Sequence, residues 1–412
     1  MEQISRNTVE KNPDIATPKI TRVFFSFFKL GLAAFGGPAM VAYIRELSVE
    51  KNKWLSKGSF RHGVAICQSI PGATAMQAAA YAGLRAAGGA GAVAAFVGFG
   101  LPAFVLMVVL SAVYGRVHDL ASVISAFKGL QLIVIALVAN ATINFGRSSI
   151  KKWQDFVLAA GAAAILVMHG SPVSVILASA LLGLILYPSE DSLKDKSSFD
   201  TAGNALNLTE NGKNLTWKQN LATPLILLIL VGLGLTGLFF FNHKLFDLSA
   251  LMLKVDLFAF GGGYASVPLM LHEVVGVRHW MDSKIFMDGI ALGQVTPGPI
   301  VITATFVGYF IAGIPGALIG TLSIFTPSLI ILTAVVPYFD KVKDNILFQK
   351  GLRGVLASFV GLLLAVTIQF SMAIHWDIYP VLIALAAFTA LRLKQDILWV
   401  VIIGAAIAAL IL

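Results

Sequence analysis

Two short stretches decide the fold of this chain: Ala34-Phe35-Gly36-Gly37-Pro38 and Ala259-Phe260-Gly261-Gly262-Gly263. Each interrupts an apolar segment, and the match between the two regions continues downstream. Gln68-x-x-Pro71-Gly72 recurs as Gln294-x-x-Pro297-Gly298, and Lys128-Gly129-Leu130 recurs as Lys350-Gly351-Leu352. A duplicated apolar unit with Gly and Pro breaks at matching places is the sequence pattern of a transporter whose substrate binds at those breaks.

The composition is that of an integral membrane protein. The chain has 412 residues, of which 57% are hydrophobic and only 12% are charged, and its mean hydropathy is +0.83. Soluble domains carry about twice that share of charged residues. The net charge of +9 comes from basic residues spread over the loops between apolar segments. Membrane topology therefore explains the charge, and the expected partner is the lipid bilayer, with no nucleic acid.

Several classes of chemistry lack the residues that they need. Cys67 is the only cysteine, which excludes an intrachain disulfide and a cysteine-rich metal site. His272 and Glu273 are adjacent, but no further ligands follow at a suitable spacing, so no metal is expected. Phosphate-binding loops, metalloprotease motifs and cofactor-binding patterns are missing from the sequence. We expect no cofactor and no enzyme activity, and ion gradients or the membrane potential as the energy source.

The apolar segments predict an all-α polytopic membrane protein with about 13 such segments. We expect two inverted-topology repeats with broken or re-entrant helices. The boundaries are a polar cytoplasmic tail (1–20), a first membrane repeat (21–187), a polar cytoplasmic linker (188–220), a connecting transmembrane helix (221–245) and a second, inverted repeat (246–412). The expected location is a cell membrane that the chain crosses several times, with a cytoplasmic N-terminus; the resemblance described below implies the bacterial inner membrane.

The distribution of positive charge favours re-entrance. If the first two segments of each repeat dip into the membrane and return, 23 of the 30 Lys and Arg residues lie inside and five lie outside. If those segments span the membrane, the division is 20 inside and eight outside. Each repeat has an even number of crossings in both cases, so the connecting helix inverts the second repeat relative to the first.

The breaks are the predicted binding site for an oxyanion. Glycines expose backbone N–H groups, and the helices that follow would direct their positive dipole ends toward the same place. Nearby amides and hydroxyls add donors. The predicted substrate-binding residues at the breaks are Gly36, Gly37, Pro38, Gln68, Pro71, Gly72, Thr74, Gly261, Gly262, Gly263, Gln294, Thr296, Pro297 and Gly298. The alternative is structural, because Gly-Gly breaks also permit close helix packing.

Charged residues near the breaks supply further candidates. Lys29 and Lys254 occupy equivalent positions and are predicted either to contact the substrate or to extend to the membrane interface. Arg45 and Arg85 are predicted to form an entry vestibule that gathers anions, or else to be ordinary loop charges. Asp256 corresponds to Gly31 in the first repeat, so its carboxyl is an asymmetric candidate for coupling.

The motif F-x-K-L-G-x-x-x-F-G-G-P at 27–38, with W-L at 54 and C-Q-x-x-P-G at 67, closely resembles the chromate ion transporter (CHR) family. The second half, with F-G-G-G and G-Q-x-T-P-G-P, resembles the second domain of that family. The resemblance covers nearly the whole chain from about residue 21 and indicates a long-chain, two-domain chromate efflux protein. It implies that the motif residues take part in transport, and these residues include Lys29 and the glycines of the breaks.

The resemblance also implies a function: export of chromate from the cytoplasm by a secondary transporter, which confers chromate resistance. Sulfate or another oxyanion is the alternative substrate, since backbone N–H groups recognise shape and charge more than element. An anion channel is the alternative class of protein. Small-residue faces such as Gly88-Gly89-x-Gly91 suit internal packing or a homodimer.

Overall fold

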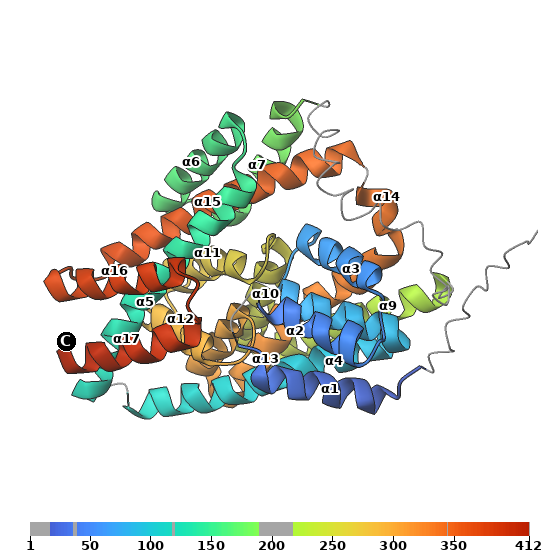
Figure 1. The fold of residues 1–412 in the computed structure, drawn as a ribbon, viewed down its shortest axis with the longest axis horizontal. Helices are drawn as coiled ribbons and strands as arrows, with labels where there is room; N and C mark the ends of the chain where they lie inside the picture. The colour runs from blue at the N-terminus through green and yellow to red at the C-terminus, as the bar shows by residue number, and fades with distance from the viewer. Residues whose placement is uncertain (1–16, 36–38, 118–119, 189–216, 344, 412) are drawn as a thin grey trace, which may run out of the picture.

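The computed structural model describes residues 17–35, 39–117, 120–188, 217–343 and 345–411. Within these ranges every regular element is a helix (Figure 1). The stretches long and apolar enough to cross a membrane are Thr74–Val117, Val123–Ser149, Leu221–Phe241, Ile300–Tyr338 and Ile346–Met372. Shorter apolar helices accompany them. The prediction of an all-α polytopic membrane protein is confirmed.

The two halves have the same order of elements. The first comprises α1 (Ile20–Ala33), α2 (Ala39–Arg45), the π-helix η1 (Glu46–Lys51), α3 (Lys57–Ser69), α4 (Thr74–Val117), α5 (Ala121–Ser149), α6 (Trp153–Val167) and α7 (Pro172–Leu186). Helix α9 (Trp217–Phe241) follows. The second comprises α10 (His243–Phe258), η2 (Gly263–Ala265), α11 (Ser266–Leu271), η3 (His272–Val277), α12 (Ser283–Val295), η4 (Ile300–Ile302), α13 (Thr303–Val335), η5 (Val336–Tyr338), α14 (Phe339–Lys343), α15 (Ile346–Met372), α16 (Ile378–Arg392) and α17 (Ile397–Ile411).

Helices α4 and α13 each contain one sharp turn, at equivalent places. Ala87 and Gly88 leave helical geometry in α4, and Ala312 and Gly313 do so in α13 with nearly the same dihedral angles. The chain reverses there. In α4, a Cβ added to Gly83 would overlap the carbonyl oxygen of Gly91, so the parts before and after the turn lie against each other as antiparallel helices. Gly83 and Gly91, on either side of the turn, are therefore in close backbone contact.

The glycine and proline breaks also lie at the tips of helical hairpins. Ser59 of α3 contacts the hydroxyl of Tyr81 in α4, which places these residues side by side on either arm of the break at Gly72. In the second half, Lys254 of α10 bonds Glu273 across the break at Gly262. Each arm is short: α3 has 13 residues, about 20 Å, against the roughly 30 Å of a bilayer core. These are the dimensions of re-entrant hairpins.

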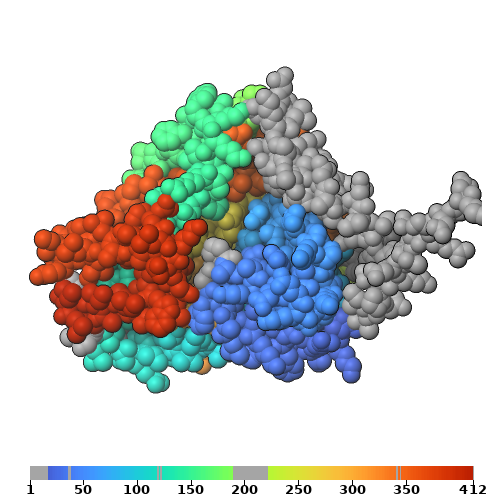
Figure 2. All heavy atoms as spheres, viewed as in Figure 1, coloured from blue at the N-terminus to red at the C-terminus, as the bar shows by residue number. Residues whose placement is uncertain are grey.

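The last helices of the halves are exchanged. Helix α15 packs against α6 and α7 of the first half, and α5 packs against α16 and α17 of the second. Figure 1 shows α16 and α17 beside α5, and in Figure 2 the red surface of α17 meets the cyan surface of the first half. Helix α9 stands apart from this core, with only 6% of its apolar window buried. It contacts α4 where Gly89 faces Thr223.

Candidate functional site

Hairpin tips from both halves meet inside the protein. The amide N–H of Gly72, between α3 and α4, donates to the carbonyl oxygen of Ala259 at the end of α10, with an N···O distance of 2.8 Å. A Cβ added to Gly262 would lie 3.3 Å from Thr74 Oγ1. A Cβ on Gly263 would lie 3.0 Å from a side-chain carbon of Ile300, where the third hairpin turns into α13. Three of the four predicted breaks therefore converge.

The fourth break, Gly36-Gly37-Pro38, lies outside the described residues. The chain on either side is described: α1 ends at Ala33 and α2 begins at Ala39. The predicted roles of Gly36, Gly37 and Pro38 stay predictions.

Left-handed backbone explains why glycine occupies the three described tips. Gly72 has φ +115°, Gly262 has φ +103° and Gly298 has φ +139°, values that L side chains rarely adopt. Immediately after Gly72 and Gly262 a new helix starts, α4 at Thr74 and η2 at Gly263. Free N–H groups at helix starts attract anions because the helix dipole is positive there. Helices α3 and α10 also end at these tips, and the carboxyl end of a helix carries the negative end of its dipole.

The residues predicted to bind the substrate differ in how exposed they are at these tips. Gln68 is exposed; Thr74, Gly261, Gln294 and Gly298 are half-buried; Pro71, Thr296 and Pro297 are buried. Thr296 donates its hydroxyl to the carbonyl of Gly293 in its own helix. Gln294 is different, because its Nε2 is buried and makes no hydrogen bond of good geometry among the described residues; the side chain of Tyr264 is its polar neighbour at the break. An amide donor in this position is suited to an anionic ligand.

The predicted basic residues lie on the exposed surface rather than at the tips. Lys29 is exposed on α1. Lys254 is exposed and its Nζ lies 2.5 Å from Glu273 Oε1. Arg45 pairs with Glu50 at 3.0 Å, and Arg85 is exposed on α4. Two of these charges are thus paired with carboxylates; the vestibule predicted for Arg45 and Arg85 and the substrate contacts predicted for the lysines stay predictions.

Asp256 is buried in the last turn of α10, and its partner is Ser328 of α13. Oδ2 of Asp256 accepts from the backbone N of Ser328 at 2.7 Å and from its Oγ at 2.5 Å. Oδ1 is buried and has no hydrogen-bond partner in the described structure. Gly72 packs so closely on Ser328 that an added Cβ would overlap its Oγ. The carboxyl group therefore sits one side chain away from a hairpin tip of the other half.

Sequence reasoning missed two further buried carboxylates. Asp288 of α12 accepts from the hydroxyl of Tyr114 and from Gln131 Nε2, both at 2.8 Å. Asp155, fully buried at the start of α6, pairs with Arg353 of α15. The available signal was the repeat itself. Gln131 and Arg353 each follow a Lys-Gly-Leu motif, so equivalent positions on α5 and α15 both bind a carboxylate.

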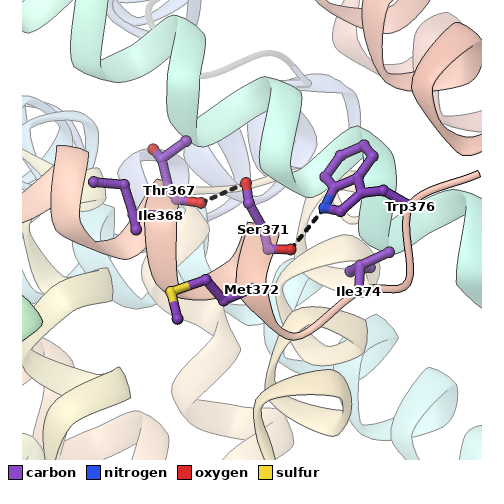
Figure 3. Close-up of a pocket in the computed structure, with 6 residues that line it drawn as sticks. All are labelled: Thr367, Ile368, Ser371, Met372, Ile374 and Trp376. Atoms are coloured by element: carbon purple, nitrogen blue, oxygen red, sulfur yellow. Dashed lines mark hydrogen bonds between the residues drawn. The ribbon is translucent and has the colours of Figure 1, made fainter.

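A surface hollow of about 520 Å³ lies away from these tips, at the turn between α15 and α16 (Figure 3). Its lining residues are Thr367, Ile368, Ser371, Met372, Ile374 and Trp376. Trp376 donates its ring N–H to the carbonyl of Ser371 at 2.7 Å, which fixes the turn. The hollow contains none of the residues predicted to bind substrate.

The fold and the converging tips define a class: a polytopic helical membrane protein with two structurally similar halves, whose broken hairpins meet at one place. The model of the chromate transporter family matches residues 21–184 and 246–410, one match in each half. This chain belongs to the chromate transporter family.

Individual relatives agree in length as well as in sequence. An uncharacterised transporter of Methanocaldococcus jannaschii is 44% identical over 99% of this chain and 97% of its own length. A chromate transport protein of Pseudomonas aeruginosa is 30% identical over 92% of this chain and 86% of its own length. A probable chromate transport protein of Synechococcus elongatus is 30% identical over 88% and 87% respectively. No solved structure gives a significant match to this chain.

Proposed function

We propose that this protein is a secondary transporter that exports chromate from the cytoplasm. The observation that carries the proposal is the meeting of three broken hairpin tips from both halves, where Gln294 Nε2 is buried beside Tyr264 and makes no hydrogen bond of good geometry among the described residues. The family and the names of its relatives supply the substrate, because two of those relatives are named as chromate transport proteins. Glycine backbone, helix starts and an amide donor suit a tetrahedral dianion.

The proposed topology has two inverted repeats, 21–187 and 246–412, joined by the linker 188–220 and the connecting helix 221–245. The re-entrant hairpins enter and leave on one side, and four further helical segments follow them in each half. An even number of crossings in the first half leaves α9 to invert the second. This arrangement agrees with the excess of Lys and Arg on the proposed cytoplasmic side.

Alternating access is the proposed mechanism, with one half moving against the other around the tips. The membrane potential supplies enough energy for export. Moving one charge through 100 mV changes the free energy by about 2.3 kcal/mol, so a dianion that leaves an interior-negative cell gains about 4.6 kcal/mol. That corresponds to a concentration ratio of about three orders of magnitude. A proton gradient is the alternative energy source, and the potential alone does not require it.

The test is uptake of labelled chromate into inverted membrane vesicles, with and without an imposed potential. Export from the cell corresponds to uptake in these vesicles, and we expect it to rise when the potential is applied. Absence of accumulation under both conditions would remove the exporter proposal. Competition by sulfate and molybdate in the same assay measures how far the site discriminates among oxyanions. A flux far above about 10³ per second would indicate a channel.

A further inference from the structure

Two buried oxygen atoms without hydrogen-bond partners flank the hairpin tip at Gly72. One is Oδ1 of Asp256 on α10, and the other is Oε1 of Gln77 in the first turns of α4. Both side chains are sealed from solvent: Asp256 is 1% exposed and Gln77 is 0% exposed. A buried polar atom without a partner in the described structure is costly, and the cost is largest for a carboxylate.

The Gln77 side chain and the Ser328 hydroxyl that bonds Asp256 both lie beside Gly72. A Cβ added to Gly72 would overlap Ser328 Oγ, which bonds Asp256, and would lie 2.9 Å from Gln77 Nε2. The orientation of the Gln77 amide is fixed, because Nε2 donates to the carbonyl oxygen of Pro71 at 2.5 Å. Its Oε1 is thereby left as an acceptor. A carboxylate oxygen and an amide oxygen beside the same glycine are both acceptors, and a proton or a metal cation is a species that both can bind.

The backbone contributes negative as well as positive partial charge at this tip. Helices α3 and α10 end here with the negative ends of their dipoles, and α4 begins here with its positive end. In transporters with broken helices, the carboxyl ends of helix halves and the carbonyls beside them commonly hold Na⁺ or H⁺. The helix starts that follow the breaks remain available for the anion.

The equivalent place in the other half lacks these groups. Asp256 corresponds to Gly31, Ser328 to Ala103 and Gln77 to Thr303. Thr303 is satisfied within its own helix turn, since its hydroxyl donates to the carbonyl of Ile300 at 2.8 Å. A feature required by the architecture would occur twice in a duplicated fold. The acceptor pair occurs once, which indicates a functional role.

We propose that Asp256 and Gln77 form a site for one monovalent cation, Na⁺ or H⁺, whose binding strengthens oxyanion binding at the adjacent tips. The proposal rests on the proposed function for its anion. A positive charge beside Gly72 neutralises Asp256, which would otherwise repel a dianion at the tips. Linkage is reciprocal, so the oxyanion must strengthen cation binding by the same factor.

Other ionisable groups near Asp256 are accounted for in the described structure. Helices α11 and α13 carry no Asp, Glu, Lys, Arg or His, and Tyr309 is the ionisable side chain of α13. On α10, Asp247 pairs with Arg278, and Lys254 pairs with Glu273. The remaining ionisable residues on α10 and on the adjoining α4 and α9 are His243, Lys244, Tyr81, Arg85, Tyr114, Arg116 and Lys218. Asp256 is the buried carboxyl group among them.

The test measures molybdate affinity of the purified full-length protein, first as NaCl replaces choline chloride at constant pH and ionic strength, then as pH falls without Na⁺. We expect one of these changes to strengthen binding by about tenfold or more, in a saturable way. Dependence on Na⁺ identifies the metal ion, and dependence on pH alone identifies the proton. Asp256→Asn should remove the dependence. Asp247→Asn, an exposed carboxyl on the same helix, should keep it.

Two outcomes overturn the cation site: affinity that depends on neither ion, or a dependence that survives in Asp256→Asn. If Asp256→Asn does not fold, Gln77→Met replaces it and should weaken the dependence on the ion. Thermal unfolding in Na⁺ or at lower pH separates this proposal from the transport proposal. If the cation raises the unfolding temperature of the wild type and not of Asp256→Asn, the cation site is supported. If the same protein binds no oxyanion, the transport function is contradicted.

Discussion

Arg353 of α15 binds Asp155 of α6 with both Nε and Nη2, at 3.0 and 2.8 Å. The same carboxylate accepts from Tyr187 and from the backbone N–H groups of Lys151 and Lys152. The guanidinium carbon of Arg353 also lies 4.4 Å from the centre of the Tyr187 ring. This fully hydrogen-bonded ion pair joins the two halves at a buried position, and removing one partner leaves a charge without compensation.

We therefore expect Arg353→Met to destabilise the protein by about 3–5 kcal/mol. Thermal unfolding in detergent measures the loss. The double variant Asp155→Asn/Arg353→Met should recover part of it, because no buried charge then remains. The control is Arg392→Met, whose guanidinium bonds Asn144 at the surface and should change stability by less than about 0.5 kcal/mol. Equal losses in the Arg353 and Arg392 variants would contradict the importance of burial.

The reversed helices α4 and α13 predict a second stability effect. In α13, a Cβ added to Gly308 would overlap the carbonyl oxygen of Gly316, and in α4 Gly83 meets Gly91 in the same way. Backbone atoms cannot swing aside as a side chain does, so Gly83→Ala and Gly308→Ala should each cost about 1–3 kcal/mol in unfolding free energy.

Gly161→Ala is the matched control for these two variants. Gly161 lies in α6, and a Cβ there would have no neighbour within 4 Å. Alanine should be neutral or stabilising at this position by up to about 1 kcal/mol, because it lowers the entropy of the unfolded chain. If all three variants unfold alike, the close approach of the antiparallel arms is wrong.

The pairing of the first breaks predicts matching transport defects in the two halves. Gly37→Val and Gly262→Val should each lower chromate flux by at least about tenfold in vesicles with equal amounts of protein. For Gly262 the reason is its left-handed backbone and its closeness to Thr74. Gly234→Val on α9, where a Cβ has open space, should leave flux unchanged. Normal flux in the Gly37 and Gly262 variants would show that the substrate binds elsewhere.

The buried amide of Gln294 predicts a loss of affinity rather than of stability. A hydrogen bond to a charged ligand contributes about 1.5–3 kcal/mol, so Gln294→Leu should weaken oxyanion binding by roughly 10- to 100-fold. Equilibrium binding of molybdate to the purified protein measures this change. Gln395→Leu, at an exposed position, should bind as the wild type does. Unchanged affinity in Gln294→Leu would mean that this donor serves packing alone.

Much of this architecture was predictable from the repeat. The breaks, their pairing and the helical class follow from Gly and Pro positions in apolar segments, because backbone in a bilayer must satisfy its own hydrogen bonds. A turn between the apolar segments 64–84 and 91–114 was predictable from the Gly88-Gly89-x-Gly91 cluster. The close backbone contact across that turn, between Gly83 and Gly91, was not predicted, because spacing along the chain does not show how tightly two antiparallel arms pack.

The candidate site was predicted in part for a similar reason. The tips at Gly72 and Gly262 were recognised because their left-handed backbone requires glycine, and glycine is visible in the sequence. Gln77 and Ser328 were missed because neither is unusual in sequence, and they matter only where the other half brings Asp256 and Gly72 beside them. Spacing within one repeat does not identify residues that act together across the interface between the two repeats.

The proposed inverted topology predicts that equivalent loops face opposite sides of the membrane. Ser148, near the end of α5, and His375, after α15, lie in matching regions of the two halves, and both are exposed. Cys67 is the only cysteine and is buried, so Cys67→Ala provides a background for single-cysteine variants. In intact cells, an impermeant maleimide should label His375→Cys, and Ser148→Cys should react only after permeabilisation, because Arg147, Lys151 and Lys152 mark a cytoplasmic loop. Labelling of both positions from one side would exclude inversion, whatever the substrate.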